Sequence, residues 1–370
     1  MVSIQLIYWL LKLKKIENGN TPLDYACENG NENIVKFLIE HGAEINKKIE
    51  NDNTPLNYTC KNGNENIVKY LIDYGANINK ENEYDGIPLC CACENGNENI
   101  VKYLIEHGAE INKENNYGVT PLEYACENGN ENIVRYLLEH GAFINKENNY
   151  GVTPLCCACE KGNETIVKYL VEYGANVNKG YKYYDFPLFN ACKSGNKNIV
   201  KYLVEHGVDV NKENNYGVTS LCCACEKGNE IIVKYLVEHG ADINKENKYG
   251  DTALSNACIN GNENIVKYLI EHGANDNNGN SPLINACIKE NENLVKYLVE
   301  HGAKISKKNK SGYSALCYAY ENENETIFNF LIEKERPDEN DYEDDDDVNN
   351  NDDIDEYEID INYFILEEVD

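Results

Sequence analysis

The sequence predicts an all-α protein, a solenoid in which antiparallel helix pairs stack one on another. Three observations predict this fold. A motif of about 33 residues returns ten times along the 370-residue chain. Seven of the eight prolines fall at one position of that motif. Each copy holds two short segments with helical spacing of apolar residues, and in most copies a glycine follows each segment.

The repeats align on a T-P-L triplet or a variant of it. The copies start at Thr21, Thr54, Ile87, Thr120, Thr153, Phe186, Thr219, Thr252, Ser281 and Ser314. The step is 33 residues, except for 29 residues between Thr252 and Ser281. The four missing residues fall in a connecting loop, so we expect one solenoid of ten repeats over residues 18–334.

Each repeat is expected to form a helix, a turn, a second helix and a connecting finger. In the first copy, the Thr21 hydroxyl suits an N-cap and Pro22 suits the first helical position, where no N–H is needed. Gly30 can end this first helix in a left-handed conformation, and Asn31 can cap the second helix. The second helix carries an apolar stripe that consists of Ile34, Val35, Leu38 and Ile39.

These residues resemble the ankyrin repeat, whose pattern is G-x-T-P-L-H-x-A-A, then G-x-x-x-I-V-x-x-L-L, then G-A-x-V-N. The match recurs ten times between about Asn18 and Lys334. The resemblance implies antiparallel helix pairs stacked into a curved solenoid, with hairpin fingers that project from it at right angles.

The chain departs from this pattern at two positions. No copy has the histidine after T-P-L, which in the family ties the helix start to its surroundings, so a recurrent hydrogen bond is expected to be lost or replaced. Glu290 and Glu323 stand where the other copies have a glycine between the helices. A left-handed conformation there costs a glutamate about 1 kcal/mol, so the C-terminal repeats should fray first. The residues in place of the histidine are Asp24, Asn57, Cys90, Glu123, Cys156, Phe189, Cys222, Ser255, Ile284 and Cys317.

The formal charge of −30 disfavours nucleic acid and anionic membrane surfaces as partners. Residues 1–17 contain one apolar run, residues 4–11, which is too short to span a bilayer. Its lysines follow the run, whereas a secretory signal places positive charge before it. We therefore expect residues 1–17 to form an N-terminal capping helix or a partial repeat, without membrane insertion. We also expect a monomer located in the cytoplasm or nucleus rather than secreted.

The sixteen cysteines and seven histidines follow the repeat. Nine cysteines share one first-helix position that requires a small buried residue, and every histidine precedes the glycine that ends a second helix. This accounts for them without a metal, a cofactor or a catalytic site, so we expect no enzyme. A thiol redox sensor remains an alternative, built on the C-x-x-C pairs Cys90/Cys93, Cys156/Cys159 and Cys222/Cys225, because a thiol near a helix N-terminus has a lowered pKa.

Six fingers place a tyrosine three residues before the T of T-P-L, a position that in the ankyrin family commonly contacts ligands. Tyrosine brings a large contact area with few rotors, so we expect these side chains to bind a partner. The alternatives are that the rings stack on one another, or that an AT-rich genome inflates the number of tyrosines. We call this set the tyrosine ladder: Tyr84, Tyr117, Tyr150, Tyr183, Tyr216 and Tyr249.

Repeat six has an irregular finger and the one aromatic and basic cluster in an acidic array. Central aromatic anchors are typical of binding hot spots, so we expect partner contact to centre there. The alternative is drift of an unconstrained repeat. This repeat-six cluster consists of Tyr181, Lys182, Tyr183, Tyr184, Phe189 and Lys193.

Residues 335–370 form an acidic tail with eighteen Asp or Glu and one Arg, and we expect disorder there. The tail could solubilise the protein, mask lysine-bearing fingers, or add its segment 363–368 as a strand to a partner. Its last residues, Glu367, Glu368, Val369 and Asp370, are similar to the C-terminal E-E-V-D of cytosolic heat-shock chaperones. That resemblance implies docking to tetratricopeptide co-chaperones.

The sequence therefore predicts a non-catalytic scaffold that binds a protein partner on the concave and finger surface of a solenoid. One alternative is an adaptor that joins a bound client to tetratricopeptide co-chaperones through the tail. The other is the thiol redox sensor.

Overall fold

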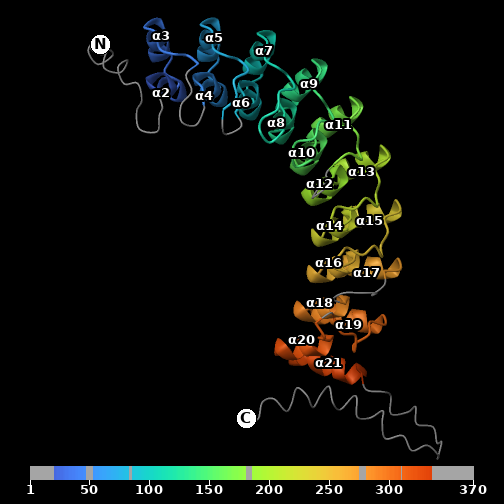
Figure 1. Ribbon diagram of the computed structural model, residues 1–370. Helices are drawn as coiled ribbons and strands as arrows, with labels where there is room; N and C mark the ends of the chain where they lie inside the picture. Colours follow the sequence, from blue (N-terminus) through green and yellow to red (C-terminus); the bar gives the residue numbers. More distant parts are fainter. Residues whose placement is uncertain are drawn as a thin grey trace, which may run out of the picture.

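The computed structural model describes residues 21–46, 53–82, 86–180, 186–274, 281–309 and 311–335. These residues form twenty helices, two in each of the ten repeats, which stack into one curved array (Figure 1). Within the described residues the β pairing is limited to one antiparallel bridge, between Glu213 and Thr219. The predicted all-α solenoid is confirmed. The expected capping helix of residues 1–17 and the tail of residues 336–370 lie outside the described residues.

The ten first helices are seven or eight residues long and begin directly after each T-P-L threonine or its replacement. They are α2 (Pro22–Glu28), α4 (Pro55–Asn62), α6 (Pro88–Asn95), α8 (Pro121–Glu127), α10 (Pro154–Lys161), α12 (Pro187–Ser194), α14 (Ser220–Glu226), α16 (Ala253–Ile259), α18 (Pro282–Ile288) and α20 (Ala315–Glu321).

The ten second helices are nine residues long, except for the last, which has eleven. They are α3 (Glu32–Glu40), α5 (Glu65–Asp73), α7 (Glu98–Glu106), α9 (Glu131–Glu139), α11 (Glu164–Glu172), α13 (Lys197–Glu205), α15 (Glu230–Glu238), α17 (Glu263–Glu271), α19 (Glu292–Glu300) and α21 (Glu325–Glu335).

The first helices begin as the sequence predicts. The Thr21 hydroxyl accepts a hydrogen bond from the Asp24 amide at 3.3 Å, and Pro22 occupies the first turn. Asp24 also replaces the missing histidine, because its carboxylate accepts bonds from the Thr21 amide and hydroxyl. In repeat five the Cys156 sulfur has the same role and accepts from the Thr153 hydroxyl at 3.3 Å. The lost bond is thus replaced within the capping turn.

Asn31 is the N-cap residue of the second helix, as the sequence predicts, but its side chain makes no cap hydrogen bond. The equivalent side chain does cap in some repeats; Asn196 accepts from the Ile199 amide at 3.2 Å. Several of these asparagines also donate to the preceding repeat, as Asn196 does to the Gly162 carbonyl at 3.1 Å and Asn262 does to Gly228 at 3.2 Å. Asn196 makes both bonds at once, because its Oδ1 accepts in the cap while its Nδ2 donates to the preceding repeat.

The curvature follows from the sizes of the side chains between the helices. First helices lie on the inner side of the arc and pack more closely on their neighbours than second helices do (Figure 1). Ala92 and Cys93 of α6 are fully buried between helices. Second helices are spaced by long side chains instead, such as Lys102 over the Tyr136 ring at 5.5 Å. Small residues inside and large ones outside give each repeat a wedge shape.

Candidate binding surface

Each complete finger is a tight turn organised by one asparagine. In repeat five, Asn148 Oδ1 accepts hydrogen bonds from the Tyr150 amide at 2.9 Å and the Val152 amide at 3.0 Å. Gly151 takes a φ of 76°, in the left-handed region that favours glycine. In the N-N-Y-G turn, the first asparagine thus supplies the side-chain acceptor and the glycine supplies the left-handed conformation. The asparagines with this role are Asn115, Asn148, Asn214, Asn247 and Asn309.

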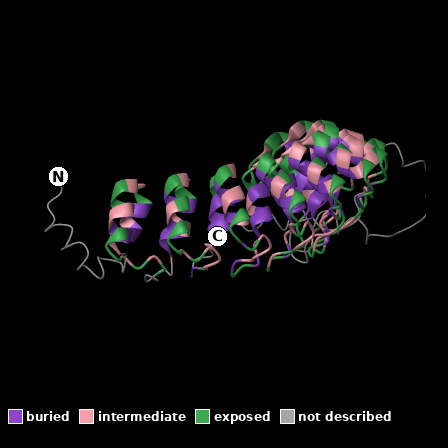
Figure 2. Cartoon of the chain, turned by 90° about the horizontal axis from the view of Figure 1, so that it is seen from above, coloured by how far each residue is buried: buried purple, intermediate pink, exposed green. Residues whose placement is uncertain are grey.

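Neighbouring fingers are joined through their main chains. The Asn149 amide donates to the Tyr117 carbonyl at 2.8 Å, and the Lys248 amide donates to the Tyr216 carbonyl at 2.8 Å. These bonds set the spacing of the tyrosines that follow. Figure 2 shows the loops gathered along one side of the helix layer.

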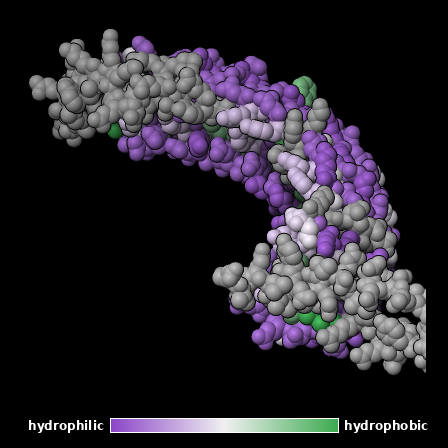
Figure 3. Space-filling view, turned by 60° about the horizontal axis from the view of Figure 1, so that its bottom comes forward, coloured by the Kyte–Doolittle hydropathy of each residue, from purple (hydrophilic) through white to green (hydrophobic). Residues whose placement is uncertain are grey.

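The tyrosine ladder is present as two stacked pairs. The ring centroids of Tyr117 and Tyr150 are 6.2 Å apart, and those of Tyr216 and Tyr249 are 6.4 Å apart. Stacking, the alternative to binding in the sequence analysis, therefore occurs, yet the four residues stay 37% to 61% exposed. The surface on this side is mostly hydrophilic, with paler patches along the curve (Figure 3). Tyr84 and Tyr183 lie outside the described residues.

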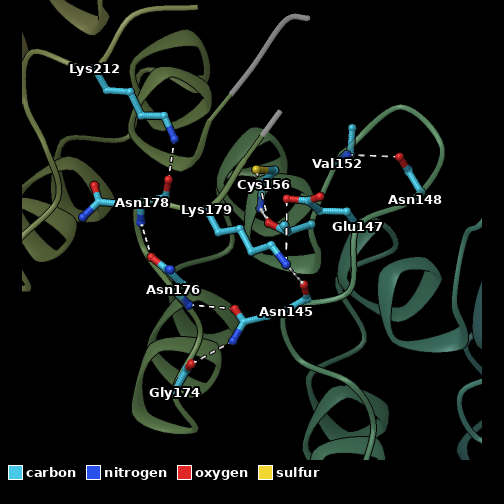
Figure 4. Close-up of polar contacts among 11 residues, drawn as sticks. Asn145, Glu147, Asn148, Val152, Cys156, Gly174, Asn176, Asn178, Lys179 and Lys212 are labelled. Atoms are coloured by element: carbon cyan, nitrogen blue, oxygen red, sulfur yellow. Dashed lines mark hydrogen bonds and ion pairs between the residues drawn. The ribbon is translucent and has the colours of Figure 1, made fainter. Parts of the chain in front are cut away.

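An asparagine at the base of six successive fingers fastens consecutive repeats together, as Figure 4 shows for Asn145. Asn145 donates to the Gly174 carbonyl at 3.2 Å and accepts from the Asn176 amide at 2.8 Å. The Gly174 carbonyl is at the end of the second helix of the next repeat, where carbonyls lack helical partners. The asparagines that bond in this way are Asn46, Asn79, Asn112, Asn145, Asn178 and Asn211.

Finger lysines pair with glutamates of the preceding finger. Lys146 lies 2.7 Å from Glu114, and Lys245 lies 2.7 Å from Glu213. These pairs are partly exposed, so each contributes on the order of 0–1 kcal/mol. Their main consequence is that the positive charges on this side of the array are largely neutralised.

The repeat-six cluster is described only in part. The Phe189 ring is half-buried, 5.7 Å from the ring of Phe186, which is fully buried. Lys193 lies 3.1 Å from Glu160 of the preceding repeat, so its charge is neutralised within the solenoid. Tyr181, Lys182, Tyr183 and Tyr184 lie outside the described residues. The residues of the tail motif, Glu367, Glu368, Val369 and Asp370, also lie outside the described residues.

The histidines cap helices. His41 is the C-cap of α3; its Nδ1 lies 2.8 Å from the Phe37 carbonyl, and its ring stacks on Phe37 at 3.9 Å. Tyr74 stands in this position in the second repeat and packs on Tyr70 at 4.4 Å. The other histidines in the same position are His107, His140, His206, His239, His272 and His301.

The cysteines are free thiols, and all except the half-buried Cys317 are buried. Burial raises the pKa of Cys91 to about 11 and holds the pKa of Cys90 and Cys225 well above the usual value. A reactive pair requires an accessible thiolate, so this environment disfavours the redox alternative. No group of three or more His, Cys, Asp or Glu within the described segments is arranged to hold a metal ion.

Glu123 is a site residue that the sequence analysis named only as a histidine replacement. It is 5% exposed in α8, and burial raises the pKa of its carboxyl to about 7. Asn148 of the next finger donates to it at 2.6 Å. In repeat four the finger asparagine, Asn115, instead donates to the Tyr124 hydroxyl at 3.2 Å. Cys157 stands in place of that tyrosine in repeat five, so Asn148 has no tyrosine hydroxyl to bond there. This substitution in the sequence could have indicated that Asn148 bonds another group.

The fold and the surface define a solenoid repeat protein with preformed, repetitive fingers. Profiles of known families identify the repeat. The profile described as Ankyrin repeats (3 copies) matches residues 47–115, 81–148, 112–181, 177–247, 239–309 and 275–343, and the profile described as Ankyrin repeat matches residues 18–49. The chain belongs to the ankyrin-repeat family.

Ankyrin repeats indicate a protein–protein interaction scaffold, and the family is typically non-catalytic. A comparison with individual curated proteins gives no match. Among the described helices, none has both the length and the apolar character needed to cross a membrane.

Proposed function

We propose that the tyrosine ladder and the adjoining first helices form a surface that binds a protein partner. The observation that carries this proposal is the combination of ordered main chain with exposed rings. Asn148 fixes the turn beneath Tyr150, and main-chain bonds join that finger to its neighbour. A partner that contacts such rings meets little loss of loop entropy on binding.

The experiment compares two sets of exposed aromatic residues on the same array. The test variant changes Tyr117, Tyr150, Tyr216 and Tyr249 to Ala. The control variant changes Tyr74 and Tyr173 to His, the residue that most other repeats carry at that C-cap. Both control tyrosines are about half exposed, at 51% and 47%.

Proteins captured by each variant from a cell lysate are quantified by mass spectrometry, and affinity is then measured for the leading candidate. We expect the test variant to lose at least tenfold in affinity and the control to stay within twofold. Hot-spot tyrosines typically cost 1 kcal/mol or more each when truncated, which supports a loss of this size. Equal affinity of the wild type and the test variant would remove the ladder from the binding surface.

The repeat-six cluster extends this proposal to the centre of the array. Its specific test changes Tyr183 and Tyr184 to Ala in the full chain. A partner affinity that stays within twofold of the wild type would exclude this cluster while leaving the ladder proposal intact.

A further inference from the structure

A hollow of about 390 Å³ is lined by residues of the first helices α2, α4, α6 and α8 and of the fingers before α4 and α6. These helices lie on the inner side of the arc (Figure 1). The alignment of the repeats explains why the hollow forms. Tyr58 and Tyr124 occupy the same position of repeats two and four, and the residue between them in repeat three is Cys91. Cysteine lacks the ring that both neighbours have, so a slot remains between two tyrosines that line it.

The buried part of the lining is mixed, because Asn57 and Asn82 contribute amide groups and Cys90 and Cys91 contribute thiols. Cys90 and Cys91 are both buried, and both line the hollow. The tyrosine hydroxyls above are held by amide donors: Asn53 donates to the Tyr58 oxygen at 3.4 Å, and Asn115 donates to the Tyr124 oxygen at 3.2 Å. The aromatic walls therefore have fixed positions before a ligand arrives, which lowers the entropic cost of binding.

The charged residues of the lining leave one carboxylate in excess. Glu28 and Glu94 line the hollow together with a single lysine, Lys61. Lys61 lies 3.8 Å from Glu94, and both side chains are exposed, so the pair is weak and can open. Aromatic walls with surplus negative charge attract a cation through the ring quadrupole as well as through the carboxylates.

The same surface chemistry already joins neighbouring second helices in this chain. The Lys36 ammonium lies 5.7 Å from the Tyr70 ring centroid, and the Lys234 ammonium lies 5.5 Å from that of Tyr268. A guanidinium suits the slot better than an ammonium, because a planar cation can stack on a ring while it bonds a carboxylate with two N–H groups.

We propose that this hollow, the Cys91 pocket, binds an arginine side chain presented by a basic peptide segment. The pocket deepens the proposed function, because it names the chemistry of a partner on the first-helix part of that surface. Its test does not depend on the tyrosine ladder or on an identified partner.

The probe is a fluorescent peptide of four Arg-Gly repeats, compared with the same peptide containing citrulline, which keeps the shape and removes the charge. Fluorescence anisotropy gives the affinity for the full chain at 150 mM salt. The decisive variant is Cys91→Tyr, which fills the slot with the residue that repeats two and four already carry. Cys223→Tyr is the matched control, because it makes the same change in repeat seven.

We expect Cys91→Tyr to weaken binding of the arginine peptide at least tenfold and Cys223→Tyr to leave it within twofold. The citrulline peptide should bind at least tenfold more weakly than the arginine peptide. If Cys91→Tyr fails to fold by circular dichroism, Glu28→Gln and Glu94→Gln together test the pocket, with an expected loss of at least fivefold.

Equal affinity of the wild type and a folded pocket variant would overturn the proposal, since the peptide would then bind through general attraction to an acidic chain. The ladder variant should bind the peptide as the wild type does. The two proposals are distinguished by which variant loses affinity for the peptide. Loss in the pocket variants alone supports the Cys91 pocket, and loss in the ladder variant alone would place peptide binding on the ladder instead.

Discussion

At the residue scale, two glutamates hold a backbone conformation that the other eight repeats give to glycine. Glu290 has a φ of 54° and Glu323 a φ of 55°, as the sequence predicted from the missing glycines. Each carries strain of about 1 kcal/mol from its Cβ. Changing both to Gly should therefore stabilise the C-terminal repeats and slow amide exchange in α18 to α21 about fivefold per kcal/mol.

The control for this prediction makes the opposite substitution, from glycine to a residue with a Cβ. Gly261 has a φ of 68°, and an added Cβ would find its nearest neighbour at 3.6 Å, so strain alone opposes a side chain there. Gly261→Ala should lower protection of α16 and α17 by a similar factor. Unchanged exchange in both experiments would mean that the left-handed turns contribute nothing to local stability.

The buried carboxyl of Glu123 predicts a pH dependence of stability. Its pKa is raised from 4.5 to about 7 by burial, with a smaller contribution from the charge of Glu127. The folded chain therefore binds this proton more tightly than the unfolded chain does. The contribution of Glu123 to the free energy of unfolding should therefore be greatest below pH 4.5 and fall by at most about 3 kcal/mol as the pH rises through about 7.

Glu123→Gln removes that titration while keeping a neutral polar group opposite Asn148. The measurement is the urea midpoint of the wild type and the variant from pH 5 to pH 8. The variant should gain on the wild type as the pH rises, and the histidines cancel in the difference because both chains carry them. A difference that stays constant across this range would show that Glu123 is charged in the folded chain at both extremes.

The thiols provide a residue-scale prediction against the redox alternative. At pH 8 a disulfide reagent should react quickly with Cys317 alone in the native chain, and with all sixteen cysteines in urea. Cys317→Ser should remove the fast reaction. Mild peroxide should leave the thiol count unchanged; the loss of thiols in pairs would instead restore the C-x-x-C sensor.

The sequence could predict local features of the backbone more readily than contacts between repeats. Thr21, Pro22 and Glu290 were correctly placed because capping and left-handed turns depend on local geometry. Asn31 was correctly placed as the N-cap residue, but the sequence did not determine whether its side chain bonds its own helix, since the equivalent asparagine does so in some repeats and not in others. The Cys91 pocket depends on the absence of a ring between two others, and such a gap becomes visible only when three repeats are stacked.

At the element scale, the finger-base asparagines form hydrogen bonds between repeats that could not be predicted from the sequence alone. Asn145→Ala removes the bond to the Gly174 carbonyl and the bond from the Asn176 amide. At roughly 1 kcal/mol for each bond, local stability should fall by about 2 kcal/mol. Exchange of the Asn176 amide should accelerate at least tenfold.

Asn128→Ala is the matched control for the finger-base bond. Its side chain bonds only within its own repeat, to the Tyr124 carbonyl at 3.0 Å, and it is exposed. Exchange at Asn176 should be unaffected in this variant. Equal effects of the two substitutions would show that the loss reflects helix ends in general rather than the link between repeats.

At the scale of the whole molecule, each repeat of the array packs mainly on the repeats next to it. Helix pairs with extensive contact belong to the same repeat or to adjacent repeats throughout the described residues. Each repeat buries its own leucines and valines against the next, as Leu254 and Val266 do in repeat eight. Stability should therefore be a sum of local terms, and the strained C-terminal repeats can open without the remainder.

Truncation after Ala274 tests this locality, because it removes repeats nine and ten at the connecting loop. Amide exchange measured by mass spectrometry should stay within twofold of the full chain in α6 to α13, while α16 and α17 lose protection as the new end. The distant helices keep every neighbour that they had, which is why no change is expected there. Loss of protection across the array would mean that the ten repeats fold as one cooperative unit, and the strain at Glu290 would then lower the stability of the whole solenoid rather than that of its end.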